Sequence, residues 1–245
     1  MDIFFEVHCD LPREGPGDNA STRQAYSLLK GLPPKPRILD IGCGPGMQTV
    51  ELAKISDGTL VAVDTHLPFL EALRRSAAAE GVTEHIDIQQ ASMFDLQFPE
   101  HSFDLLWCEG AIFIIGFGEG LRTWRRLVKE DGCVAVTELS WIKTNPPAEI
   151  VAYWKENYPA IRTIAENLQT AADAGYTAIS HFILPDSSWW DNYYHPIEKR
   201  ITMLREKYRG DEAVQKDLDG HQEEVEMFRK YSEWYGYVFY VMRKK

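Results

Sequence analysis

The sequence lacks any long apolar run, although 44% of its 245 residues are hydrophobic. No stretch approaches the ~18 residues that a membrane-spanning helix needs, and the N-terminal segment carries acids and no apolar core of a secretory signal. Basic residues are also scarce, because 26 Lys and Arg stand against 37 Asp and Glu and give a formal charge of −11. Non-specific nucleic-acid binding needs a basic surface. We therefore expect neither a membrane span nor a nucleic-acid partner.

Cysteine is sparse as well, and no pair has C-x-x-C spacing. The four cysteines are Cys9, Cys43, Cys108 and Cys133. A zinc site or a disulfide framework is therefore not expected, and a reducing cytoplasm is the expected location. Internal repeats and low-complexity segments are also absent from the sequence. Its length suits one α/β domain that spans residues 1–245.

Two nucleotide-binding motifs are missing after the first apolar strand. A dinucleotide site would show G-x-G-x-x-G, and a P-loop would place a Lys-Ser/Thr pair after its glycines. Residues 38–46 instead read ILDIGCGPG, with Gly42, Gly44 and Gly46 at alternate positions. Glycine has no Cβ and accepts positive φ, so the backbone of such a turn can approach a ligand closely. The pattern predicts a ligand-binding turn between strand and helix, and the alternative is a tight turn without a ligand.

From residue 37 onward, short apolar segments alternate with amphipathic ones. The expected strands are 37–41, 59–64, 86–92, 103–110, 132–139, 177–184 and 235–242. The expected helices are 21–29, 47–55, 67–81, 121–130 and 161–176. This alternation indicates a Rossmann-like α/β fold with a seven-stranded, mostly parallel sheet and helices on both faces. Ligands bind such sheets beyond the carboxyl ends of the strands.

Three parts flank or interrupt this pattern. Residues 1–36 form an N-terminal arm and helix, in which residues 1–20 read as a loop because Pro and Gly punctuate them. Residues 37–143 form the core, and residues 144–245 form a C-terminal part. The latter contains an insertion, residues 185–234, with two amphipathic helical runs between the sixth and seventh strands.

Asp64 ends the second expected strand, 24 residues after Asp40. A carboxylate at that position can accept hydrogen bonds from both hydroxyls of a ribose. The position therefore suits a nucleoside cofactor, either S-adenosylmethionine (AdoMet) or NAD. The alternative is that Asp64 caps the helix that follows it.

These segments together resemble the class I AdoMet-dependent methyltransferases, in the broad group that includes the ubiquinone/menaquinone-biosynthesis C-methyltransferases. The resemblance rests on ILDIGCGPG, AVD, ASMFDLQFPEHSFDLLWCEGA and LVKEDGCVAVTEL, within residues 38–139. LPREGPG, CEGAIFIIGF, HFILPDSSWW and YGYVFYVMRK further resemble a bacterial and archaeal branch of methyltransferase-domain proteins. The resemblance to that branch does not identify a substrate. Met47 departs from the pattern, since the family often has Thr or Ser there.

The resemblance implies a set of cofactor-binding residues. They are Asp40, Gly42, Cys43, Gly44, Gly46, Asp64, Thr65, Ser92, Met93 and Glu109. Asp40 would order the loop or receive the methionine amine, and Met93 would cover the adenine or simply pack in the core. Glu109 is also a catalytic candidate, because it would face the sulfonium or an acceptor amine; alternatively it caps a helix.

The acceptor side is less defined. Methyl transfer relies largely on proximity and orientation, and a base is needed only if the acceptor must lose a proton. The candidates for such a base are His8, Tyr193, Tyr194 and His195. The aromatic WWDNYYHP segment, residues 189–196, would line an acceptor site or pin the insertion to the sheet, and the arm would act as a lid or pack on the sheet.

We therefore expect methyl transfer from AdoMet to a small-molecule acceptor, with no metal, and a homodimer is compatible with the sequence. The alternative is a catalytically idle AdoMet-binding protein with a regulatory or interaction role. An NAD-dependent oxidoreductase is disfavoured by the glycine spacing. The sequence does not choose among O-, N-, C- and S-methylation.

Overall fold

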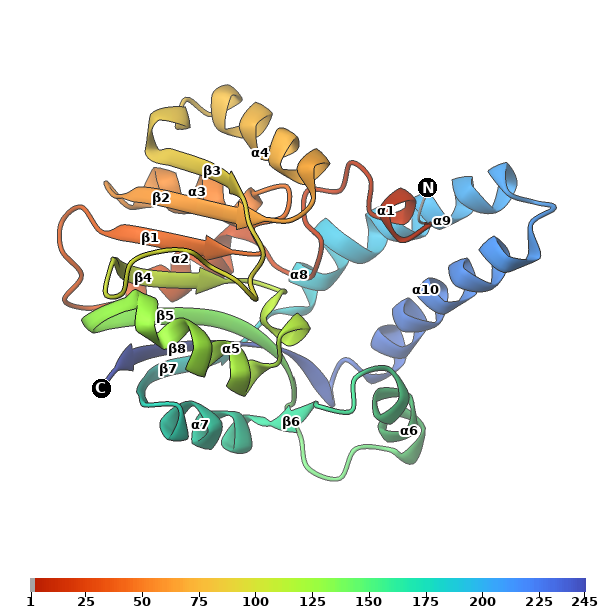
Figure 1. Ribbon diagram of the computed structural model, residues 1–245. Coiled ribbons are helices and arrows are strands. Elements are labelled where there is room, and N and C mark those ends of the chain that lie inside the picture. The colour runs from red at the N-terminus through yellow and green to blue at the C-terminus, as the bar shows by residue number, and fades with distance from the viewer. Residues whose placement is uncertain (1–2) are drawn as a thin grey trace.

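The computed structural model describes residues 3–245 and is organised around one eight-stranded sheet (Figure 1). The strands are β1 (Arg37–Ile41), β2 (Thr59–Asp64), β3 (Ile86–Gln90), β4 (Phe103–Cys108), β5 (Val128–Trp141), β6 (Arg162–Thr163), β7 (Tyr176–Ile183) and β8 (Tyr235–Lys244). Seven of them follow the order β3-β2-β1-β4-β5-β8-β7, and the two-residue β6 pairs with β5 off this path. The strands β1 to β5 are parallel, whereas β8 is antiparallel to both β5 and β7. The expected Rossmann-like fold is confirmed, with β6 as the strand that the sequence pattern did not show.

Helices cover both faces of the sheet. The helices α2 (Asn19–Leu28), α3 (Met47–Ile55) and α4 (Leu67–Ala79) pack on one face, and α5 (Phe117–Trp124) and α7 (Ile164–Asp173) pack on the other. Both faces of the central strands are buried, as their near-continuous apolar sequences predict. The N-cap of α2 is Asp18, whose carboxylate accepts a hydrogen bond from the backbone N–H of Ser21 at 2.7 Å.

The expected helix 121–130 is wrong in its second half. The helix α5 ends at Trp124, a single 3₁₀ turn follows at Arg125–Leu127, and β5 begins at Val128. Val128 is fully buried and pairs with Phe103 of β4. Burial in the sheet therefore overrides the helical preference of the LVKE segment. The helix α7 is similarly shorter than 161–176, because Thr163 and Glu166 form a capping box that starts it at Ile164.

A third hydrophobic core lies beyond the carboxyl ends of the central strands. The helices α1 (Ile3–Val7), α6 (Ala148–Asn157), α8 (Asp186–Trp189), α9 (His195–Lys207) and α10 (Glu212–Tyr231) contribute to it. A π-helical turn, Trp190–Tyr194, joins α8 to α9. Figure 1 shows α9 and α10 as a helical hairpin that projects from this end of the sheet, with α1 beside α9. The expected insertion is therefore confirmed as a helical insertion between β7 and β8.

The helix α1 corrects the expectation of a loop over residues 1–20. Val7 is fully buried in the third core, and the Glu6 carboxylate accepts hydrogen bonds from Tyr208 Oη at 2.6 Å and Lys207 Nζ at 2.7 Å. These partners lie about 200 residues away in α9 and just after it. Because tertiary contacts stabilise this one-turn helix, local sequence periodicity could not reveal it.

Candidate functional site

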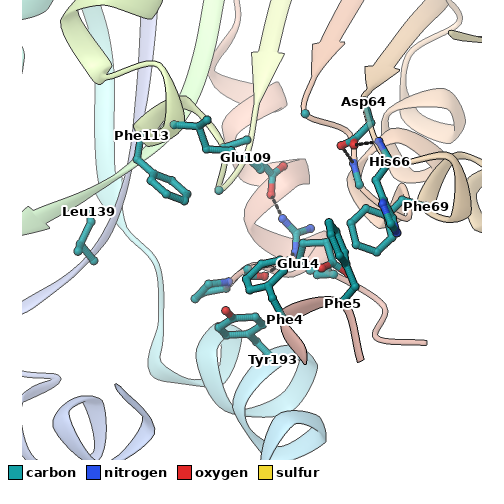
Figure 2. Close-up of a pocket in the computed structure, with 18 of the residues that line it drawn as sticks. Phe4, Phe5, Glu14, Asp64, His66, Phe69, Glu109, Phe113, Leu139 and Tyr193 are labelled. Atoms are coloured by element: carbon teal, nitrogen blue, oxygen red, sulfur yellow. Dashed lines mark hydrogen bonds and ion pairs between the residues drawn. The ribbon is translucent and has the colours of Figure 1, made fainter. Parts of the chain in front are cut away.

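A cavity of about 920 Å³ lies at the carboxyl ends of β1, β2, β3, β4 and β5. Its lining comes from the glycine loop, the strand ends, the N-terminal arm, α6 and the insertion. Figure 2 shows Asp64, His66 and Phe69 at one side of this cavity and Phe113 and Leu139 at the other. The volume lies at the upper end of the range that small-molecule and cofactor sites occupy. The site therefore has room for two ligands that meet.

The glycine loop forms one end of the cavity, as its spacing predicted. Gly42, Gly44 and Gly46 all have positive φ, between 54° and 88°. A Cβ on Gly42 would lie 2.5 Å from the Cβ of Ala111, and one on Gly46 would lie 2.2 Å from Leu73 Cδ1. Side chains are therefore excluded there by both conformation and space. Gly42 and Cys43 line the cavity together with Gly44, whereas Gly46 lies behind the loop as the N-cap of α3.

Asp64 lies at the end of β2, where the sequence placed it. Its two carboxylate oxygens accept hydrogen bonds from the backbone N–H groups of Gly44 at 3.0 Å and His66 at 2.9 Å. The cap of α4 is His66, and no side chain caps that helix. Asp64 therefore joins two loops across the cavity floor, and its carboxylate keeps further lone pairs for a ligand.

An aromatic cluster that the sequence did not predict lies beside Asp64. The ring of Phe5 stacks on His66 with centroids 4.0 Å apart and an interplanar angle of 2°, and Phe69 packs edge-on against His66 at 4.4 Å. His66 is half-buried. The N-terminal arm thus lines the same end of the cavity as the glycine loop.

Asp40 is fully buried and does not line the cavity. Its Oδ2 accepts hydrogen bonds from Thr49 Oγ1 at 2.6 Å and Gln48 Nε2 at 3.3 Å, while Oδ1 has no partner. Burial raises the pKa of Asp40 to about 7, and the Thr49 hydroxyl opposes that shift. Of its two expected roles, ordering the loop is the one that this geometry supports.

Glu109 reaches the cavity wall but is already engaged. It accepts hydrogen bonds from Arg13 Nη2 at 2.6 Å, Thr22 Oγ1 at 2.8 Å and Trp107 Nε1 at 2.8 Å. The side chains of Arg13 and Glu109 are 4% and 0% exposed, so this is a buried ion pair between the arm and β4. These three donors engage both carboxylate oxygens of Glu109. The geometry supports a role for Glu109 in holding the arm, and its catalytic role stays a prediction.

Glu14 is a site residue that the sequence did not predict. Both oxygens of its carboxylate are inaccessible to water and have no hydrogen-bond partner, and its Cγ lies beside Gly44. Burial, and secondarily the charge of Asp64, raises the pKa of Glu14 to about 8. Figure 2 places Glu14 between Asp64 and Tyr193 within the cavity. The signal was weak, because Glu14 stands in a Pro- and Gly-rich segment without periodicity.

The remaining cofactor candidates differ in position. Ser92 and Met93 follow β3, are half-buried and line the cavity, and Met93 also packs against the core between the sheet and α5. Thr65 lines the cavity next to Asp64 but is exposed. The expected positions beyond β2 and β3 are therefore brought together at one end of the site.

Of the four residues expected as bases, Tyr193 lines the cavity, whereas the other three do not. His8 is buried, its ring nitrogens contact Phe4 O at 2.9 Å and Tyr193 Oη at 3.3 Å, and burial lowers its pKa to about 4. Tyr194 is buried in the third core and donates a hydrogen bond to Glu224 at 2.9 Å. His195 is exposed and packs against Trp190. The geometry does not support these three as bases, since a reacting group must lie within reach of its ligand, and their catalytic roles stay predictions.

The aromatic segment of the insertion divides between two roles. Trp189 and Tyr193 line the cavity, whereas Trp190 does not. Trp189 also stacks on Phe228 of α10 at 4.2 Å and packs on Tyr237 of β8 at 5.2 Å. The segment therefore fixes the insertion to the sheet and contributes to the cavity wall at the same time.

Comparison with known proteins agrees with this architecture. Residues 38–132 match the family described as "Methyltransferase domain". The chain is 27% identical over 160 residues to phosphoethanolamine N-methyltransferase 1 of Arabidopsis thaliana and 24% identical over 201 residues to sterol 24-C-methyltransferase erg6 of Aspergillus fumigatus. These alignments cover 64% and 77% of this chain but only 32% and 53% of the relatives. The chain thus spans between a third and about half of the length of these curated relatives.

Solved structures cover the chain more fully. A SAM-dependent methyltransferase of Geobacter sulfurreducens, solved with S-adenosyl-L-homocysteine, superposes with a TM-score of 0.84 at 18% identity, over 100% of this chain and 98% of that one. The [4+2]-cyclase SpnF superposes with a TM-score of 0.74 at 16% identity, over 92% and 80%. The chain therefore has the fold of a SAM-dependent methyltransferase, and its residues 38–132 match a methyltransferase domain.

Two further properties concern the described residues, 3–245. No group of three or more His, Cys, Asp or Glu side chains in that range is arranged to hold a metal ion. None of the helices in the same range combines the length and the apolar character that crossing a membrane requires.

Proposed function

We propose that this protein transfers a methyl group from AdoMet to a small organic acceptor. The observation that carries the proposal is the continuity of one cavity, from the glycine loop and Asp64 to the aromatic chamber of Phe113, Tyr158 and Trp189. AdoMet, when bound, supplies a methyl group on a positively charged sulfur. Enclosing the donor and the acceptor in one space supports a reaction driven by proximity and orientation.

The lining fits such a donor at the end that carries the glycine loop. The glycines leave backbone exposed to a ligand, Asp64 retains acceptor sites for ribose hydroxyls, and the Phe5–His66 pair offers an aromatic surface. The two unpaired oxygens of Glu14 suit a cationic ligand, because a buried carboxylate gains most from a nearby positive charge. AdoMet carries positive charge on its sulfur and its amine.

The charge of the lining favours a neutral or cationic acceptor. Six carboxylate side chains line the cavity: Glu14, Asp64, Glu109, Asp217, Glu223 and Glu224. Two basic side chains line it, Arg13 and Lys216, and Arg13 is paired with Glu109. An anionic acceptor would therefore meet net repulsion, whereas aromatic walls favour an apolar or cationic one.

We also propose that the protein is related to the ubiquinone/menaquinone-biosynthesis methyltransferases. That relationship does not identify an acceptor. We also propose that residues 1–245 act as one methyltransferase unit, in which the insertion 185–234 and the arm enclose the acceptor, and that the protein acts in the cytoplasm.

Calorimetry and product analysis test the proposal in two steps. AdoMet and S-adenosylhomocysteine should bind and raise the melting temperature, and a panel of neutral and cationic small molecules should reveal an acceptor that releases S-adenosylhomocysteine. If neither compound binds, the cofactor assignment fails.

The rival is an AdoMet-binding protein without methyltransferase activity. It is supported by the structural similarity to the [4+2]-cyclase SpnF, because the fold does not determine the reaction. Binding of AdoMet without release of S-adenosylhomocysteine for every acceptor would favour this rival.

A further inference from the structure

Glu138 is a buried carboxyl group that the proposed function has not used. It lies near the carboxyl end of β5 and is 2% exposed. Its Oε1 accepts a hydrogen bond from Tyr158 Oη at 2.6 Å, whereas its Oε2 has no partner. An unpaired buried oxygen costs stability, so its presence beside the cavity indicates a role other than packing.

Tyr158 connects this carboxyl group to the cavity. It directly follows α6 as its C-cap and lines the cavity, whereas Glu138 itself does not. The ring of Phe113 packs edge-on against Tyr158 with centroids 6.0 Å apart, and Leu139 lines the cavity next to Glu138 in the chain. Phe113 and Leu139 lie in Figure 2 on the side away from Asp64. The pair therefore faces the acceptor chamber.

The surroundings allow Glu138 to change its protonation near neutral pH. Burial raises the pKa of Glu138 to about 8, and the Tyr158 hydroxyl opposes that shift. The titratable side chains around the pair are Tyr237, Tyr240 and Cys108, which act on Glu138 or are acted on by it, and Arg162, which acts on Tyr158. Burial raises the pKa of each of these tyrosines and of Cys108, so they stay neutral. A base works best when its pKa lies near the operating pH.

We propose that Tyr158 and Glu138 form a proton relay that deprotonates the acceptor during methyl transfer. The inference rests on the proposed function. The acceptor atom gives its proton to Tyr158 Oη while the Tyr158 proton moves to Oε1 of Glu138, which becomes a neutral carboxylic acid. The acceptor atom keeps the electron pair of the broken bond and forms the new bond to the methyl carbon. The pair of the broken carbon–sulfur bond stays on sulfur, whose positive charge is neutralised.

The other described candidates each lack one of these properties. Tyr193 lines the cavity, but it contacts His8, whose pKa burial lowers to about 4. Glu224 lines the cavity, but the tyrosine that donates to it, Tyr194, does not. Glu109 already has three donors, and Glu14 lies beside Asp64 and Gly44, at the opposite end. Tyr158 is thus the catalytic residue of the relay, because it reaches the cavity. Glu138 acts through it.

Kinetics with paired acceptors test the relay. The panel contains amines, phenols and thiols, which lose a proton on methylation, and pyridine and dimethyl sulfide, which have none to lose at neutral pH. Tyr158→Phe and Glu138→Gln should each lower kcat by about 100-fold or more for the first group and leave KM and the second group nearly unchanged. The double variant should be no worse than either single one, and AdoMet affinity should not change. An equal loss of kcat with both groups of acceptors, or no loss of kcat with either group, would overturn the relay.

The matched control is Glu149→Gln on α6, whose exposed carboxylate pairs with Lys230. It should retain wild-type rates with every acceptor. If the wild-type protein releases no S-adenosylhomocysteine with the whole panel, the proposed function itself fails, and the proton relay fails with it.

A second readout is independent of turnover. NMR of protein labelled at the glutamate side-chain carboxyl carbons, with Glu138→Gln to assign the signal, should give a Glu138 titration midpoint near 8. Tyr158→Phe should move that midpoint upward, because the lost hydrogen bond stabilised the charged form. A midpoint near the ordinary value of 4.5 would overturn the relay even if methyl transfer is confirmed.

Discussion

The two ends of the cavity are built in different ways. At the end with the glycine loop, Asp64 and Glu109 accept hydrogen bonds from groups on the strand ends, loops and arm around them, while both oxygens of Glu14 stay unpaired. We call this the prebuilt end, because the sheet, its loops and the arm hold its frame. The walls of the other end come from α6 and the insertion, and Glu138 Oε2 and Trp154 Nε1 are buried there without partners. Both ends thus keep polar atoms that a ligand can complete, and they differ in the elements that carry them.

Breaking the buried Arg13–Glu109 pair should have the largest effect. Arg13→Met leaves Glu109 without its countercharge, and loss of one partner of a buried pair costs about 3–5 kcal/mol. We expect the free energy of unfolding in urea to fall by that amount. The control is Arg122→Met, whose exposed pair with Glu119 should cost at most about 1 kcal/mol. If Arg13→Met and Arg122→Met lose the same small amount of unfolding free energy, the arm does not belong to the prebuilt end.

Removing the Asp64 carboxylate should have the next largest effect, on AdoMet affinity. Asp64→Ala should weaken binding by about 1.5–3 kcal/mol, the usual contribution of a hydrogen bond to a charged group. Calorimetric titration measures this change. Asp87→Ala on the neighbouring β3 is the control, because Asp87 is exposed and does not line the cavity. Unchanged affinity in the Asp64 variant would mean that Asp64 only joins the loops of Gly44 and His66.

The sequence predicted the prebuilt end well because its signals are local. The spacing of Gly42, Gly44 and Gly46 and an acid after the next strand are properties of short segments, and the alternation of strands and helices places them at one edge of the sheet. Arg13 and Glu14 were missed because their role depends on where a non-periodic arm crosses the core. Neither α1 nor the pairing of Val128 in β5 is determined locally, since distant partners decide both.

The acceptor end was predicted poorly for the same physical reason. His8, Tyr194 and His195 are chemically suitable bases, but burial and side-chain direction in the insertion decide which of them reaches a ligand. The pair of Glu138 and Tyr158 joins a strand to the end of a helix 20 residues later. No sequence motif records that contact.

The pH dependence of stability and of AdoMet binding tests the role of Glu14 at the cofactor end of the cavity. Because its folded-state pKa is raised to about 8, it stabilises the ligand-free protein below its ordinary pKa of 4.5, and this contribution is lost as pH rises toward 8. Glu14→Gln should flatten this pH dependence of the melting temperature. At pH 7 the cationic AdoMet should make the Glu14 carboxyl release its proton, by up to about one proton per binding event. Calorimetry in buffers of different ionisation enthalpy measures that release, and an unchanged release in Glu14→Gln would contradict the assignment of Glu14 to the cofactor end.

The smallest effect should come from His195, which stands at the start of α9 outside the cavity. His195→Ala removes an exposed ring that packs on Trp190 at 5.3 Å, so stability should change by no more than about 0.5 kcal/mol. Turnover and its pH profile should stay as in the wild type. Tyr194→Phe, one residue earlier, should cost about 1 kcal/mol because it removes the buried hydrogen bond to Glu224. A large loss of turnover in His195→Ala with unchanged stability would contradict the geometry, since it would require the insertion to move until α9 faces the acceptor.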